Sequence, residues 1–239
     1  MAGKLFGIGV GPGNPELLTM KAVRAIEALD VIIAPKTEKK TSSVALKIAR
    51  DYIQPQTEIV YQEFPMTDDF ASDDTSWEKN KAEILALLGQ GKSVGFLTLG
   101  DPMFFSTYIY VLERLKAEQA KGEVEFTIET IPGITAFCAI ASATNTPIIE
   151  GDNVLSIVPA NLPLERVQEA LEHTDNVVLM KVSKDYPELL KLLDEQNMVD
   201  KAILVSRYGL ENEKVFSDIR EAQEAKLNYL STIITRRSK

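Results

Sequence analysis

The chain has few of the residues that build disulfides and metal centres. Its 239 residues include one cysteine, Cys138, and one histidine, His173. A single cysteine excludes an internal disulfide and a multi-cysteine metal site, and a single histidine excludes a histidine-rich metal site. His173 lies in the polar stretch 172–175, which is typical of an exposed helix end and makes a Ser-His-Asp triad a poor interpretation. We therefore expect chemistry without a protein-bound metal.

Long apolar runs and an excess of positive charge are also missing. No run approaches the roughly 18 residues that a membrane-spanning helix needs. Glycines interrupt the residues after Lys4, so no signal-peptide core is expected there. The formal net charge of −9 argues against a general nucleic-acid binder. These features favour a cytoplasmic protein with no membrane or nucleic-acid partner.

Strand-like and helix-like patterns alternate along the chain, which predicts an α/β protein with parallel sheets. Strands are expected at 4–10, 30–34, 57–61, 92–99, 125–131, 154–158, 176–180 and 202–205, with helices at 18–29, 41–52, 77–88, 102–117, 134–143, 164–171 and 186–196. The segments 213–216 and 229–235 are expected to be late antiparallel strands. The polar stretch 116–122 suggests a boundary between one domain at 1–118 and another at 124–239.

Three of the expected strands run into turns rich in glycine and proline. These turns are Gly11-Pro12-Gly13, Gly100-Asp101-Pro102 and Pro132-Gly133. Ligands of open α/β sheets bind at the carboxyl ends of strands, and glycine lets a ligand approach the backbone. Thr135 could add a hydroxyl donor. A plainer alternative is that Asp101 caps a helix whose first residue is Pro102.

Two familiar nucleotide-binding patterns do not fit. A dinucleotide fingerprint needs glycine at positions i, i+2 and i+5, but the third place falls on Pro12 or Asn14 here. Gly91-Lys92-Ser93 resembles the end of a P-loop, yet the earlier glycine that this motif requires is Ala86. A nicotinamide-dependent oxidoreductase and a nucleotide hydrolase are therefore disfavoured.

The order of the strand-end motifs resembles the tetrapyrrole methylase family. The stretch 9–22 is similar to the opening signature of that family, and Leu99–Pro102 and Ile131–Ala136 are similar to two later signatures in the same order and spacing. The resemblance spans nearly the whole chain. It implies two α/β/α domains with a cofactor cleft between them, use of S-adenosyl-L-methionine, and a homodimer. Asn14 departs from the aspartate more often found there, which concerns the helix cap.

Within this family, the chain is similar to members that methylate C20 of precorrin-2 or of cobalt-factor II in cobalamin biosynthesis. The segments 100–110 and 30–36 carry this resemblance. Ala34-Pro35 replaces a Tyr-Asp pair of the members that methylate uroporphyrinogen III, which argues against that activity. Another methylase of the corrin pathway and a diphthine synthase-like methyltransferase remain alternatives. No residue distinguishes a substrate that holds cobalt from one that does not.

The resemblance also implies which residues contact the ligands. Carried over position by position, the cofactor contacts are Pro12, Leu99, Gly100, Asp101, Met103, Phe104, Thr135, Ala136, Ala160, Met180, Tyr208, Gly209 and Thr232. A tetrapyrrole carries several carboxylates, so a chain of net negative charge needs local cations to attract it. The expected substrate contacts are Lys36, Lys39, Lys40, Tyr108, Lys181 and Arg207. The group that accepts the proton is not identified, and Tyr108, Tyr110 and Glu16 are candidates.

Overall fold

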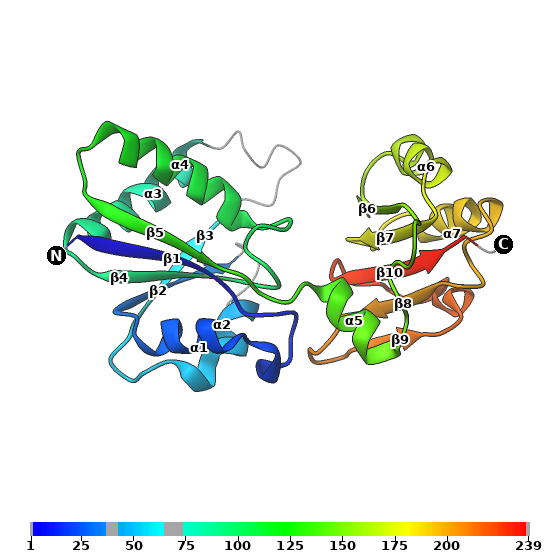
Figure 1. Ribbon diagram of the computed structural model, residues 1–239, viewed down its shortest axis with the longest axis horizontal. Coiled ribbons are helices and arrows are strands. Elements are labelled where there is room, and N and C mark those ends of the chain that lie inside the picture. The colour runs from blue at the N-terminus through cyan, green and yellow to red at the C-terminus, as the bar shows by residue number, and fades with distance from the viewer. Residues whose placement is uncertain (1, 37–42, 65–73, 238–239) are drawn as a thin grey trace. The chain divides into compact units, whose positions relative to one another are not determined.

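The protein consists of two compact units, Met1–Thr135 and Ala136–Lys239. A computed structural model describes residues 2–36, 43–64 and 74–237 (Figure 1). Each unit contains a five-stranded sheet with helices on its faces, which confirms the predicted α/β class. No helix within the described ranges is long and apolar enough to cross a membrane.

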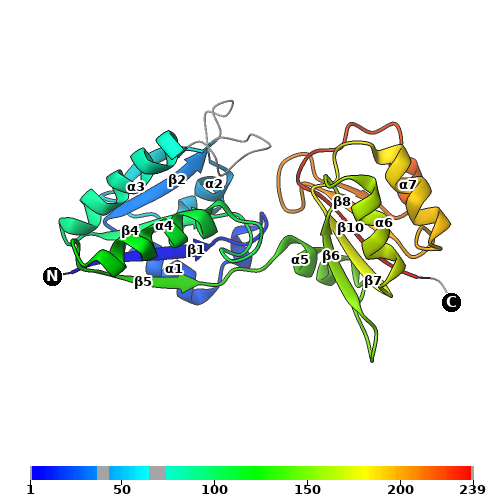
Figure 2. The ribbon, with the colours of Figure 1, turned by 90° about the horizontal axis from the view of Figure 1, so that it is seen from above.

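The first unit is an open parallel sheet in the order β3-β2-β4-β1-β5. The strands are β1 (Gly3–Gly9), β2 (Val31–Lys36), β3 (Glu58–Glu63), β4 (Ser93–Thr98) and β5 (Phe126–Ile131). Helices α1 (Met20–Glu27) and α2 (Val44–Ala49) cover one face, and α3 (Asp74–Gly89) and α4 (Thr107–Lys121) cover the other (Figures 1 and 2). Two short 3₁₀ turns, Pro15–Leu17 and Arg50–Tyr52, complete this unit.

The central strands β2 and β4 are buried along most of their length, as a sheet covered on both faces requires. Leu5 of β1 and Phe96 of β4 belong to one buried cluster with Ile84 of α3 and Leu115 of α4. Each side chain of this kind contributes about 1.5–3 kcal/mol when it is fully buried. The chain leaves β1 toward α1 on one face and leaves β4 toward α4 on the other. The helices that follow these two neighbouring strands therefore lie on opposite faces of the sheet, which is the arrangement where α/β sheets bind ligands.

Strand β5 belongs to the first unit, whereas the sequence placed the domain boundary ahead of it. It pairs in parallel with β1 from Gly3↔Phe126 to Ile8↔Ile131. The charged stretch 116–122 is instead the mostly exposed end of α4, which Gly122 closes with a φ of +74°. Charge in this stretch reflects solvent exposure of a helix end, and the compact units divide after Thr135.

The second unit contains a mixed sheet in the order β6-β7-β10-β8-β9. Its strands are β6 (Leu155–Pro159), β7 (Asn176–Met180), β8 (Ile203–Ser206), β9 (Lys214–Phe216) and β10 (Ser231–Arg236). Strand β10 is antiparallel to β7 and β8, and β9 is antiparallel to β8, so the expected late antiparallel strands are confirmed. Helices α6 (Leu164–Glu172) and α7 (Tyr186–Glu195) cover one face and α5 (Ala136–Thr144) the other (Figures 1 and 2). A 3₁₀ turn spans Ile219–Ala222.

Candidate functional site

The three glycine-containing turns of the first unit meet at the carboxyl edge of its sheet, because β1 lies between β4 and β5. Gly11 and Gly100 form an isolated antiparallel bridge. The Gly100 N–H donates to the Gly11 carbonyl at 2.8 Å, and the Gly11 N–H donates back to the Gly100 carbonyl at 3.3 Å. Both residues have φ values near +70° (73° and 72°), a conformation that costs glycine little.

The backbones of these turns approach so closely that no side chain fits between them. A Cβ added at Gly133 would lie 2.1 Å from the Gly100 carbonyl oxygen, and one added at Gly9 would lie 2.6 Å from the same oxygen. We call this edge, formed by the turns 9–13, 99–105 and 131–135, the glycine edge. A ligand bound here would lie against main chain.

Asp101 joins two turns of the glycine edge. Its Oδ2 accepts the Gly133 N–H at 2.9 Å, and its Oδ1 accepts the Met103 N–H at 2.8 Å. An ionised carboxylate has about four lone-pair positions, so two bonds leave capacity for a hydroxyl or amine of a ligand. Asp101 is not a helix cap, because α4 begins at Thr107 with Ser106 as its N-cap. The plainer interpretation of Asp101-Pro102 is therefore wrong.

Thr135, at the end of the β5 turn, has a polar atom without a partner. Its Oγ1 is buried and makes no hydrogen bond within the described residues. An unpaired buried hydroxyl costs roughly 1–3 kcal/mol. Such an atom fits a site that a polar ligand completes. Pro12, also predicted as a contact, is buried in the β1 turn, and Leu99 is partly buried.

The β4 turn carries apolar side chains beside Asp101. Met103 is 54% exposed. The Phe104 ring lies edge-on against the Phe105 ring, with 4.8 Å between their centroids. Sequence reasoning named Met103 and Phe104 but missed Phe105, whose φ of +47° is unusual for a bulky residue. No sequence pattern signals such a backbone conformation.

The predicted contacts of the second unit also lie at one sheet edge. The Ala160 N–H donates to the Met180 carbonyl at 2.7 Å, and Met180 is the cross-strand partner of Thr232. Tyr208 and Gly209 follow β8, whose last residue, Ser206, pairs with the first residue of β10. Ala136 is the first residue of α5. The carboxyl ends of β6, β7 and β8 and the start of β10 thus form what we call the hydroxyl edge, after its Ser206, Ser231 and Thr232 side chains.

Two predicted substrate cations occupy the hydroxyl edge. Lys181 directly follows β7, and its Nζ lies 5.8 Å from the centroid of the Tyr229 ring. Arg207 directly follows β8, and its Nε donates to the Glu211 carbonyl at 2.7 Å. Both residues have positive φ values, +63° and +59°. The edge therefore offers cations next to buried hydroxyls.

Tyr108 lies elsewhere than expected. It is fully buried, and its hydroxyl shares a hydrogen bond with Thr130 Oγ1 at 3.0 Å. Its ring occupies the space where a Cβ of Gly7 would otherwise lie, 2.1 Å from the ring. Burial raises the pKa of the Tyr108 hydroxyl. The structure thus corrects the expectation of a substrate contact or base: Tyr108 packs in the core.

The remaining candidates lie in separate surroundings. Lys36, at the end of β2, pairs with Glu63 at 2.7 Å, and this contact lowers the pKa of the Glu63 carboxyl. Lys39 and Lys40 lie outside the described residues. Tyr110 packs its ring 5.7 Å from Trp77 on α3. Glu16 is exposed in the turn that Asn14 caps.

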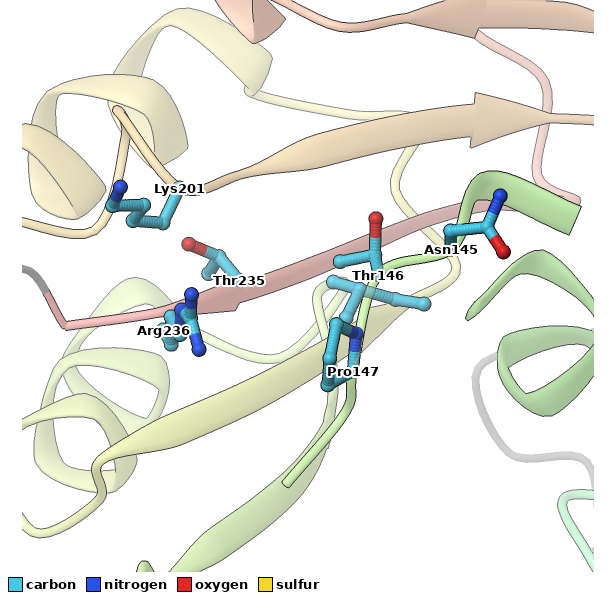
Figure 3. Close-up of a pocket in the computed structure, with 7 residues that line it drawn as sticks. Asn145, Thr146, Pro147, Lys201, Thr235 and Arg236 are labelled. Carbon is cyan, nitrogen blue, oxygen red and sulfur yellow. The ribbon is translucent and has the colours of Figure 1, made fainter. Parts of the chain in front are cut away.

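One further pocket, of about 210 Å³, lies at the opposite end of β10 from Thr232 (Figure 3). Figure 3 shows Thr146 and Pro147 on one side and Thr235, Arg236 and Lys201 on the other, and the lining is completed by Asn145 and Ile234. It contains none of the predicted ligand contacts.

Comparisons with known proteins agree with these features. The family described as Tetrapyrrole (Corrin/Porphyrin) Methylases matches residues 4–223. The cobalt-precorrin-2 C(20)-methyltransferase of Salmonella typhimurium is 35% identical over 98% of this chain and 96% of that protein. The precorrin-2 C(20)-methyltransferase of Sinorhizobium sp is 30% identical over 97% of this chain and 94% of that protein.

Solved structures share the fold. The uroporphyrin-III C-methyltransferase of Thermus thermophilus, in complex with S-adenyl homocysteine, superposes with a TM-score of 0.68 at 17% identity and covers 97% of both chains. The family match over residues 4–223 and the 35% identity to the Salmonella enzyme show that the chain belongs to the tetrapyrrole (corrin/porphyrin) methylase family.

Proposed function

We propose that this chain transfers a methyl group from S-adenosyl-L-methionine to C20 of precorrin-2, or of its cobalt-containing form, in cobalamin biosynthesis. The observation that carries the proposal is the 35% identity to the Salmonella enzyme over nearly the full length of both chains. The Sinorhizobium relative, named for precorrin-2 without cobalt, is 30% identical. We therefore expect the cobalt form to be the better acceptor. Other corrin-pathway methylases and diphthine synthase-like enzymes are less favoured by these relatives.

The two sheet edges have the features that a cofactor site needs. The cofactor contacts that we propose are Pro12, Leu99, Gly100, Asp101, Met103, Phe104 and Thr135 in the first unit and Ala136, Ala160, Met180, Tyr208, Gly209 and Thr232 in the second. The glycine edge allows a ligand to approach main chain closely, and Thr135 Oγ1 is a buried hydroxyl with no hydrogen-bond partner among the described residues. The Thermus neighbour, whose structure holds S-adenyl homocysteine, supports S-adenosyl-L-methionine as the cofactor.

S-adenosyl-L-methionine supplies the methyl group on a sulfonium, so the carbon–sulfur bond breaks as the bond to the acceptor carbon forms. The residues of this chain have to align the two reactants. Such alignment supplies about 7–11 kcal/mol of the barrier in favourable cases. The main chain around Gly100 suits that task because it is hydrogen-bonded to Gly11. Asp101 suits it because its carboxylate accepts the N–H groups of Met103 and Gly133, an arrangement that we call the Asp101 clamp. The acceptor carbon also loses a proton, for which Tyr110 and Glu16 remain the candidates.

The carboxylates of the tetrapyrrole need cations on a protein of net charge −9. We propose Lys181 and Arg207 for this role, together with Lys36 and with Lys39 and Lys40 beyond it. Lys181 and Arg207 are supported by their common position at the hydroxyl edge. Lys36 is less available, because Glu63 already pairs with it.

The decisive experiment is an anaerobic incubation of the purified chain with methyl-labelled S-adenosyl-L-methionine and precorrin-2, with and without inserted cobalt. Mass spectrometry and carbon NMR then count and locate the added methyl. We expect one methyl at C20. A methyl at another carbon would assign a different corrin-pathway methylase, and cofactor binding without transfer to either acceptor would overturn the substrate. Uroporphyrinogen III is the control acceptor and should remain unmethylated.

We also propose that the chain acts as a homodimer in the cytoplasm, as its resemblance to the family implies. Light scattering of the purified protein tests the dimer directly. A monomer at the concentration used in the methylation assay would contradict it.

A further inference from the structure

Three residues of this chain adopt a backbone conformation that does not suit them. Among the described residues, seven non-glycine residues have positive φ, and four of these are asparagine or aspartate, which tolerate the left-handed region. The other three are Phe105, Lys181 and Arg207. Lys181 and Arg207 directly follow β7 and β8 at the hydroxyl edge, and Phe105 lies in the turn between β4 and α4 at the glycine edge. Strained residues of this kind cluster at functional sites.

Phe105 is held in this conformation from both sides. On one side, Asp101 accepts the Met103 N–H with its carboxylate and the Phe104 N–H with its carbonyl, at 2.8 and 3.3 Å. On the other side, the Ser106 hydroxyl caps α4 and shares a 2.8 Å hydrogen bond with the buried Thr98 hydroxyl. The chain turns between these anchors at residue 105. Asparagine or glycine would adopt this conformation more readily than phenylalanine.

The Phe105 side chain is not buried in the core. It is 46% exposed, and its ring meets Phe104, a proposed cofactor contact, edge-on. An exposed ring on a strained, rigidly anchored backbone is suited to contact a ligand.

We infer that the Phe105 ring packs against a face of the tetrapyrrole macrocycle and sets its position beside Asp101. This inference rests on the proposed function, since it assigns a further residue to the same site. A tetrapyrrole has broad apolar faces and a rim of carboxylates. An aromatic ring complements such a face, whereas the carboxylate rim requires cations.

The test is Phe105→Asn, which removes the ring and suits the left-handed backbone. We expect the Kd for the tetrapyrrole to rise about five- to tenfold, the size of a lost aromatic contact and its buried area. The Kd for S-adenosyl-L-methionine should stay within twofold, and the thermal midpoint should stay the same or rise. Tyr61→Asn is the matched control, because Tyr61 is an aromatic residue of similar exposure, 47%, on β3. It should leave the Kd for the tetrapyrrole unchanged.

Binding is titrated by absorbance with precorrin-2 and with uroporphyrin III, an air-stable macrocycle. An unchanged tetrapyrrole Kd in Phe105→Asn, or an equal loss of cofactor affinity, overturns the inference. If Phe105→Asn does not fold, Phe105→Leu keeps the apolar bulk and should still weaken tetrapyrrole binding alone. If the wild-type protein binds a macrocycle but methylates neither acceptor, the proposed function is refuted. The binding titrations of the variants then still test whether Phe105 contacts the macrocycle. Wild-type protein that binds neither macrocycle refutes both.

Discussion

The glycine edge and the hydroxyl edge end two sheets of the same size in different ways. At the glycine edge, main-chain atoms of Gly9, Gly100 and Gly133 touch one another, and one carboxylate, Asp101, ties two turns together. At the hydroxyl edge, side chains line the strand ends, and the Ser206 and Ser231 hydroxyls bond each other at 2.9 Å. Packed main chain fixes geometry, whereas side chains supply charge and hydrogen bonds. Substitutions at the first edge should therefore cost stability, and those at the second should cost affinity.

The largest effect is expected from Gly133→Ala. The added Cβ would lie 2.1 Å from a main-chain oxygen, and main chain tied by the Gly11–Gly100 bridge cannot move aside cheaply. We expect a loss of about 3 kcal/mol or more in the free energy of unfolding, together with loss of methyl transfer. Urea unfolding measures the first effect. Gly89→Ala is the control, because its Cβ would meet nothing closer than 4.0 Å and should leave the stability unchanged or raise it.

Asp101→Asn should have an intermediate effect. The two carboxylate oxygens accept two N–H groups, and an asparagine side chain has only one oxygen to offer. One N–H would then face an amide NH₂, at a cost of about 1–3 kcal/mol in unfolding free energy, and the cofactor Kd should rise. Asp30→Asn is the control, since a single Asp30 oxygen accepts the Ser93 N–H at 2.8 Å and an amide oxygen can replace it. Equal losses of unfolding free energy in Asp101→Asn and Asp30→Asn would contradict the Asp101 clamp.

At the hydroxyl edge, Lys181→Met and Arg207→Met should change affinity and leave the unfolding free energy nearly unchanged. Each variant removes one positive charge from the hydroxyl edge. We expect the KM for the tetrapyrrole to rise about two- to fivefold, which corresponds to the free energy of one exposed ion pair. The rise should shrink as salt screens the charges. Lys191→Met on α7, whose side chain is 79% exposed, should leave the KM unchanged. An equal rise in all three variants would indicate general charge rather than a local site.

The two edges also differ in how far the sequence predicts them. The turns of the glycine edge were predictable, because Gly-Asp-Pro and Pro-Gly follow apolar runs whose ends must share one side of a parallel sheet. The position of β5 was not, because its pairing with β1 joins residues more than a hundred positions apart. Linkers between domains and exposed helix ends are both polar. The polarity of 116–122 therefore does not distinguish a domain boundary from the end of a helix.

Two side-chain placements show the same limit. Tyr108 looks like a polar residue near a ligand turn, but Gly7 on a distant strand leaves the space that its ring fills. The strain at Phe105 arises from two anchors, Asp101 and Ser106, that become visible only with the backbone in place. Sequence patterns thus predict which strand ends carry glycine-containing turns, and tertiary contacts decide which side chains remain exposed at those turns.

The smallest effect should come from Glu129, which lies on β5 within the strand rather than at the glycine edge. Hydrogen bonds from Lys21 and Lys4, both at 2.7 Å, lower the pKa of its carboxyl to about 2. Because the folded-state pKa is lowered, the ion pairs stabilise the protein above the unfolded pKa of about 4.3, and this contribution is lost as the pH falls toward 2. Glu129→Gln should cost about 0.2–1 kcal/mol at pH 7.

Urea unfolding of wild-type protein and Glu129→Gln between pH 7 and pH 3 measures this difference. It should be constant above about pH 5 and shrink below it, while the cofactor Kd at pH 7 stays unchanged. A difference that stays constant down to pH 3 would contradict the ion pairs. A weaker cofactor affinity would mean that β5 transmits strain to Gly133 and Asp101, so that the glycine edge depends on the whole strand and not only on its turn.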